Sequence, residues 1–188
     1  MINDLDNTLK ALLMREGGFK EDAIRFEAPD ASFTPPSQGV DLFLYDVREN
    51  RDLHSSEWLV ERQSNGAITK QRAPARVDCS YLITTWAGDI ASEHLLLGTV
   101  MRALLRYPSL PAEVLQGSLA GQTPPLPTAV LQPSRLQSLG EFWQALGGKP
   151  KAVLNYTVTI SVDVYPPVEA GAPVVDRQIK FELGTEGA

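Results

Sequence analysis

The sequence predicts an α/β (α+β) fold in which a mixed central sheet is flanked by helices. Apolar and polar residues alternate strictly over residues 154–164, and a second alternating run covers residues 77–86. A period of two is typical of strands with one buried face. Residues 92–106 instead place apolar side chains at the three- and four-residue spacing of a helix face. Because 188 residues is the length of one ordinary domain, we expect a single domain over residues 1–188.

An amphipathic helix is expected at the start of the chain. Leu5, Leu9 and Leu12 follow helical spacing on one face, and Gly17 can end the helix. Residues 26–39 then contain three prolines among small polar residues. Proline resists both helix and sheet pairing, so we expect an exposed loop there.

The next two segments predict strands of different kinds. Residues 40–48 are rich in apolar β-forming residues, which favours a strand covered on both faces and makes it the best candidate for the middle of the sheet. The extended runs 57–63 and 67–72 flank the Ser-Asn-Gly of residues 64–66, which predicts a hairpin. Both of these runs carry charge, so we expect the hairpin at the periphery.

The second half of the chain adds a loop, a short strand and a short helix. Prolines and glycines interrupt residues 110–132, which predicts one helical turn, a long loop and a short strand at 128–131. Ser138 and Glu141 have the spacing of a capping box, and Gly147 can end the short helix that follows them.

Charge and composition exclude several classes of function. The chain has 17 Lys plus Arg against 23 Asp plus Glu and no basic block, which argues against a nucleic-acid or anionic-membrane surface. The first residues are acidic and lack the apolar core of a secretory signal, so we expect synthesis and assembly in the cytoplasm. The longest apolar segment, residues 95–105, is too short to cross a bilayer. The single cysteine, Cys79, cannot form an internal disulfide.

The residues that usually carry chemistry do not form a catalytic or metal-binding pattern. His94 has Leu97 and Gly98 where a second metal ligand would be needed, and His54 has no ligand-like spacing either. Cys79 is expected to face inward in a strand, where a thiol is inert. Serine-hydrolase, P-loop and dinucleotide-binding glycine motifs do not occur. We therefore expect no catalytic residue, no cofactor and no metal site.

Two groups of residues allow more than one interpretation. Four carboxylates lie around the strand at 40–48: Asp41, Asp46, Glu49 and Asp52. They could hold a cation, but ion pairs with the interleaved Arg48 and Arg51 are favoured. The three tryptophans could stack on a ligand, although positions in the core are favoured: Trp58, Trp86 and Trp143.

Several segments, taken in order, resemble those of one family. They are Ile2-Asn3-Asp4-Leu5, the run from Asp41 to Asn50, the run from Asp78 to Ala87, Glu93-His94, Leu126-Pro127-Thr128, the run from Glu141 to Gly147, and Tyr156-Thr157-Val158-Thr159. Their order and spacing resemble the tail-terminator, or cap, proteins of extracellular contractile injection systems. These systems are phage-tail-like particles of the antifeeding-prophage and virulence-cassette type. The resemblance covers about residues 2–183.

The resemblance implies a tail-terminator-like fold and a role in assembly. It implies a homo-oligomer, a hexameric ring that seats on the last layer of the inner tube, ends its polymerisation and holds the final sheath ring. It implies no catalysis and no cofactor, and it makes the inner-tube and sheath proteins the partners in a particle that is later released outside the cell. The alternatives left open are a small-ligand-binding or adaptor domain of a cytosolic complex and, less favoured, an enzyme.

Two segments are predicted to make the contacts of the ring. The first is the charged corner, which we define as Arg48, Glu49, Asn50 and Arg51. It directly follows a predicted strand, so a rigid sheet would hold its hydrogen-bonding groups in place. The second is a C-terminal edge strand or arm at 174–183, with the alternating residues Val175, Arg177 and Ile179. Such an edge can accept a strand from a partner. The other interpretation is a solvated turn and a closed part of the sheet.

Overall fold

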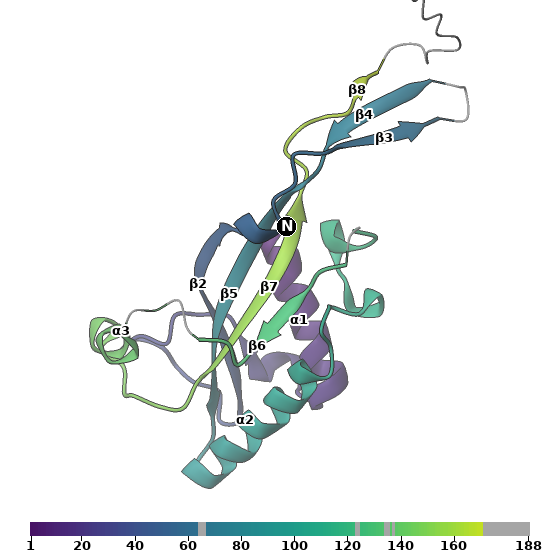
Figure 1. Cartoon of the computed structure of the whole chain (residues 1–188). Coiled ribbons are helices and arrows are strands. Elements are labelled where there is room, and N and C mark those ends of the chain that lie inside the picture. Colours follow the sequence, from purple (N-terminus) through teal and green to yellow (C-terminus); the bar gives the residue numbers. More distant parts are fainter. Residues whose placement is uncertain (64–66, 123–124, 134–135, 137, 171–188) are drawn as a thin grey trace, which may run out of the picture. The chain divides into compact units, whose positions relative to one another are not determined.

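A five-stranded mixed sheet with helices packed on it forms the larger of two units in the computed structural model (Figure 1). The structure describes residues 1–63, 67–122, 125–133, 136 and 138–170. The first unit comprises Met1–His54 and Ala75–Val162, and the second comprises Ser55–Pro74 and Asp163–Ala188.

The sheet of the first unit has its longest strand in the middle. Its strands, in spatial order, are β1 (Ile24–Arg25), β2 (Gly39–Glu49), β5 (Ala75–Trp86), β7 (Leu154–Val162) and β6 (Thr128–Val130). Only β1 pairs in parallel, and the other neighbours are antiparallel. The predicted α/β (α+β) fold with a mixed central sheet is thus confirmed.

β5 is the middle strand of the sheet. The prediction that residues 40–48 form the middle strand was therefore wrong, because these residues belong to β2. β5 pairs with β2 along one edge and with β7 along the other, and most of its side chains are buried. In β2 the burial fades from Val40, which is buried, to Glu49, which is exposed. The apolar composition of β2 therefore reflects two covered faces over its first half only.

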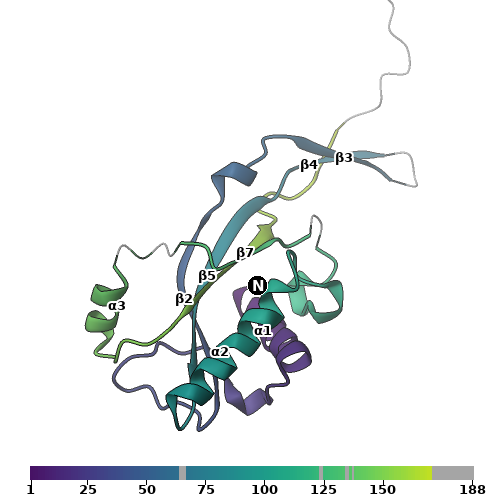
Figure 2. The same ribbon diagram turned by 60° about the horizontal axis from the view of Figure 1, so that its bottom comes forward.

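Helices α1 (Ile2–Gly17) and α2 (Ile90–Leu105) cover one face of this sheet (Figure 2). Leu5, Leu9 and Leu12 of α1 are fully buried in the same cluster as Tyr81 of β5, as the helical spacing predicted. The hydroxyl of Tyr81 also donates a hydrogen bond of 2.8 Å to Asp6 of α1. This contact fixes the helix against the middle strand.

The short helix α3 (Leu139–Leu146) lies on the other face of the sheet. The Ser138 hydroxyl accepts the backbone N–H of Glu141 at 3.2 Å, and Gly147 ends the helix in the left-handed conformation, with φ of 65°. Phe142 lies 6.1 Å, between ring centroids, from Phe43 of β2. Phe43 alternates with Leu42, which belongs to the α1 and α2 side of the sheet. The capping pattern thus predicted both ends of α3.

Short helical turns fill the connections of the first unit: η1 (Glu21–Ala23), η2 (Arg51–Leu53), η3 (Ala112–Val114) and η4 (Gly117–Leu119). The last two lie in the proline-rich region, where one turn was expected. The short strand expected at 128–131 is β6. Among the described residues, none of the helices is both long and apolar enough to cross a bilayer.

The second unit is a small antiparallel sheet. Its order is β3 (Trp58–Arg62), β4 (Ile68–Arg72) and β8 (Val168–Glu169). The two strands of the predicted hairpin are confirmed, while the turn at 64–66 lies outside the described residues. Every side chain of β3 is exposed.

Candidate functional site

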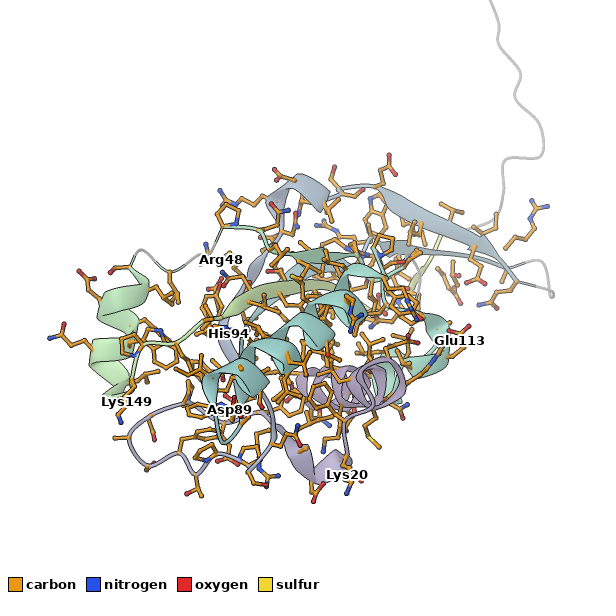
Figure 3. All side chains as sticks on the ribbon, turned by 90° about the horizontal axis from the view of Figure 1, so that it is seen from below. Lys20, Arg48, Asp89, His94, Glu113 and Lys149 are labelled. Atoms are coloured by element: carbon orange, nitrogen blue, oxygen red, sulfur yellow. The ribbon has the colours of Figure 1, made fainter. Side chains whose placement is uncertain are left out.

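The charged corner lies where β2 ends and η2 begins. Arg48 and Glu49 are the last residues of β2, Asn50 caps η2 and Arg51 starts it. Figure 3 shows Arg48 on the opposite side of the sheet from α1. The four predicted residues therefore lie at one short turn that directly follows a strand of the sheet.

Asn50 attaches this corner to the middle of the sheet. Its backbone N–H donates to the carbonyl oxygen of Arg76 at 2.8 Å, and its side-chain amide donates to Oδ1 of Asp78 at 3.0 Å. Its own side-chain oxygen accepts the N–H of Leu53 at 3.1 Å. The backbone N–H, the side-chain amide and the side-chain oxygen of Asn50 all bond within the chain, so Asn50 holds the corner in place.

Asp78 is the buried anchor for this arrangement. It is only 7 % exposed, and its Oδ1 also accepts the hydroxyl of Thr159 on β7 at 2.7 Å. One carboxylate thus joins the corner, β5 and β7. Hydrogen bonds to a charged acceptor contribute more than neutral ones, which favours a corner with little freedom of movement.

Arg48 and Glu49 each already have a partner. Arg48 makes two parallel hydrogen bonds to Asp46, of 2.6 and 2.9 Å, and this pair raises the pKa of the Arg48 guanidinium. Oε1 of Glu49 lies 2.9 Å from Nδ1 of His54. Arg48, Glu49 and His54 are exposed, whereas Asp46 is mostly covered, so a partner could still compete for these pairs.

Arg51 is the member of the corner whose guanidinium has no hydrogen bond or ion pair to any other residue that the structure describes. It lines two shallow hollows. One, of about 200 Å³, is lined by Arg48, Glu49, Asn50, Arg51, Asp52 and Asp78. The other, of about 300 Å³, is lined by Glu49, Arg51 and His54. A cation without a partner among the described residues, with carboxylates nearby, is suited to contact with a polar or acidic side chain of another protein.

The sheet face beside the corner is polar as well as buried. Arg76 is 6 % exposed and donates to the Ser161 hydroxyl at 2.7 Å, and Ser80 lies 3.1 Å from Thr157 between their hydroxyl oxygens. These residues alternate with the apolar residues that contact α1 and α2. The period-two pattern of residues 154–164 predicted two such faces, but not what the polar face pairs with.

The second predicted interface cannot be described in the same way. The edge strand at 174–183, with Val175, Arg177 and Ile179, lies outside the described residues. It stays a prediction.

The cysteine lies in the core, and the two histidines lie on the surface. Cys79 is fully buried in the core, and burial, together with Asp78 and Asp6, raises the pKa of its thiol to about 11. Its thiol is therefore protonated at neutral pH and is a poor nucleophile. His94 is exposed on α2, and His54 follows η2.

The four carboxylates around β2 do not form one group, although Glu49 and Asp52 line the same hollow. Asp41 is fully buried, with Oδ1 accepting the N–H of Glu27 at 3.1 Å, whereas Asp46 pairs with Arg48. No group of three or more potential metal-ligating residues gathers anywhere in the described ranges. The favoured interpretation of ion pairs holds for Asp46 with Arg48.

The tryptophans have three different surroundings. Trp143 is 2 % exposed, as the core interpretation requires. The Lys151 ammonium lies 3.5 Å from the ring centroid of the partly buried Trp86. Trp58 is 46 % exposed on β3, so its placement in a core was wrong. The reason is that every side chain of β3 is exposed in the small sheet that the structure describes.

The grouping of cations around Trp58 was not predicted from the sequence. Lys70 and Arg72 of β4 lie 5.0 and 5.4 Å from the centroid of this ring, and Arg72 also lies 5.3 Å from that of Tyr165. Lys70 and Arg72 alternate along the predicted strand 68–72, which indicates that both point to one face of the hairpin. Which residues of the other strand share that face depends on how the two strands pair.

Comparison with known proteins gives one family. The sequence model of the family described as the Pvc16 N-terminal domain matches residues 4–177. No protein with a curated description matches the sequence.

Two solved structures resemble the chain. One is the sheath/tube terminator of an extracellular contractile injection system, PVC, in the extended state, with a TM-score of 0.72 and 27 % identity over all of this chain and 65 % of that one. The other is the tube-terminating cap of the anti-feeding prophage, with a TM-score of 0.67 and 26 % identity over 94 % of this chain and 60 % of that one. The chain thus spans less than two thirds of the length of either. The resemblance noted in the sequence is confirmed.

Proposed function

Because this chain belongs to the Pvc16 N-terminal domain family, we propose that it is a structural cap, or tail terminator, of a contractile injection system. It forms a ring on the last layer of the inner tube and sheath and ends their polymerisation. In this proposal the two units act together as one tail-terminator-like domain.

The observation that carries the proposal is the match to the PVC sheath/tube terminator. It extends over 100 % of this chain, and the TM-score of 0.72 is accompanied by 27 % sequence identity. Fold alone does not establish function. Here, however, the family match and a second cap structure point to the same role.

We propose a structural rather than a catalytic role for the chain. Support comes from Cys79, whose thiol is fully buried, has a raised pKa and is therefore a poor nucleophile.

The proposed assembly is a hexameric ring of identical subunits, with inner-tube and sheath proteins as its other partners. Subunits of a ring contact each other head to tail, so two different surfaces of each copy are used. The charged corner is one proposed contact, because the Arg51 guanidinium has no hydrogen bond or ion pair among the described residues and Asn50 beside it is held by Asp78. The ring is assembled in the cytoplasm and becomes part of a particle that is released from the cell.

Electron microscopy of particles made with and without this chain tests the role. We expect particles lacking it to have tubes of irregular length with no density at the terminal layer, and we expect the added chain to restore both features. Tubes of normal, uniform length without the chain would contradict the proposal. A monomer that binds a small ligand in titration would favour the alternative ligand-binding or adaptor role.

A further inference from the structure

The small sheet of the second unit carries opposite charges on its two faces. In an antiparallel pair, directly opposed residues point to the same face. Arg62 opposes Ile68, Val60 opposes Lys70, and Trp58 opposes Arg72. All the basic residues of β3 and β4 are therefore on one face, which we call the cationic face.

The other face of the same sheet is acidic. Glu61 opposes Thr69, and Thr69 opposes Glu169 on β8. Leu59, opposite Gln71, also points to this side. We call this side, with its two carboxylates, the acidic face.

Within the described parts of β3, β4 and β8, the cationic face has no carboxylate to neutralise it. Within the described residues, none of the ion pairs involves Arg62, Lys70 or Arg72. The cations of β4 lie instead over the aromatic rings of Trp58 and Tyr165. Contact with a ring leaves their N–H groups available to an acceptor from outside.

Apolar side chains lie exposed among these charges. Trp58 is 46 % exposed, Val60 66 % and Val168 45 % on the cationic face, while Leu59 is 54 % exposed on the acidic face. Exposed aromatic and aliphatic groups surrounded by polar ones are typical of protein interfaces. Each face therefore offers exposed apolar side chains that a partner could cover, together with charges that a partner of opposite charge could pair with.

We propose that the second unit joins copies of this chain head to tail, with the cationic face of one copy against the acidic face of the next. The occupant of each face is thus a second copy of this chain. A contact between two different surfaces of identical subunits is the kind that builds a ring. The inference rests on the ring proposed above and names one surface that closes it.

Charge complementarity favours this occupant over nucleic acid. The cationic face has three basic residues, whereas its reverse is acidic and the whole chain carries a net charge of −6. A nucleic acid would meet few cations and a repulsive background. A second copy offers the two carboxylates of its acidic face, Glu61 and Glu169.

A charge-swap experiment on the full chain tests the contact. One variant, Arg62→Glu/Lys70→Glu, makes both faces acidic, and the other, Glu61→Lys/Glu169→Lys, makes both basic. A fourfold variant combines the changes, and the two double variants are also mixed in equal amounts. Oligomeric state is measured by analytical ultracentrifugation over a concentration series at low and high salt. Arg72 stays unchanged because it packs on both rings.

We expect the wild-type chain to associate and to dissociate as salt is raised, since exposed charges are screened. Each double variant alone should remain monomeric, while the mixture or the fourfold variant should regain association. Such recovery shows that charge, not misfolding, caused the loss.

The proposal is overturned if the wild-type chain stays monomeric throughout, if either double variant associates like wild type, or if neither the mixture nor the fourfold variant recovers. A labelled single-stranded DNA oligonucleotide serves as a second probe, and its binding to wild type but not to Arg62→Glu/Lys70→Glu would also overturn it. Tube length in particles is measured separately, so a failure of this contact leaves the proposed cap function open to its own test.

Discussion

The side-chain amide of Asn50 donates a hydrogen bond of 3.0 Å to Oδ1 of Asp78, and this contact ties the charged corner to the middle strand of the sheet. The two residues are 28 positions apart in sequence. Asp78 receives a second hydrogen bond from Thr159 on β7. The corner is therefore supported by the sheet rather than by its own turn alone.

Replacing Asn50 should destabilise the protein more than replacing its neighbour Arg51. Asn50→Ala removes the hydrogen bonds to Asp78 and to the N–H of Leu53, at an expected cost of about 1–3 kcal/mol. Arg51→Ala removes an exposed side chain and should stay within about 0.5 kcal/mol of wild type. Denaturant unfolding measures both, and equal stabilities for the two variants would contradict the assignment.

The corner should matter for assembly mainly through Arg51. If its guanidinium contacts a neighbouring subunit, Arg51→Ala should weaken ring formation about tenfold, which corresponds to about 1.4 kcal/mol. Arg48→Ala should have a smaller effect, because the Arg48 side chain is already bound to Asp46. The readout is the fraction of capped particles in electron micrographs. Normal capping by a folded Arg51→Ala protein would exclude the Arg51 side chain from the interface.

Asp41 should make stability fall as pH rises. Its carboxyl is fully buried, Oδ2 has no hydrogen-bond partner among the described residues, and burial raises its pKa to about 7. In the unfolded chain the group loses its proton near pH 3.8, so between about pH 4 and 7 the folded state holds the extra proton. The contribution of Asp41 to the free energy of unfolding is greatest below about pH 4. It decreases by up to about 1.4 kcal/mol per pH unit as the pH rises and is lost above about pH 7.

The test is the free energy of unfolding at several pH values for wild type and Asp41→Asn. The amide has nearly the same shape but does not titrate, so the decrease over this window should be smaller in the variant. Parallel curves for the two proteins would show that Asp41 titrates normally.

Cys79 should be inert in the folded protein. It is fully exposed to reagents only after unfolding, because in the core its solvent exposure is 0 % and its thiol has a pKa of about 11. A disulfide reagent at pH 8 should react with the protein much faster in guanidinium chloride than in buffer. A rapid stoichiometric reaction of the native protein would mean that the thiol is accessible and activated.

The sequence by itself determined the identity and limits of most elements. The three- and four-residue spacing of Leu5, Leu9 and Leu12 predicted α1, and Ser138 predicted the start of α3. Such signals are local, since a helix face and a helix cap each depend on residues within a few positions of each other. The overall resemblance to tail terminators was also visible in the order of the segments.

Only the tertiary structure decided which strand lies in the middle and which side chains meet. Val77 of β5 pairs with Ile160 of β7 on one side and with Glu49 of β2 on the other, which places β5 between these strands. Both pairs join residues that are far apart in the chain. Likewise, the basic residues of β3 and β4 form one face only because Val60 opposes Lys70. Strand order and register depend on long-range pairing, in which a shift of one residue turns every side chain to the other face, and no local pattern encodes that choice.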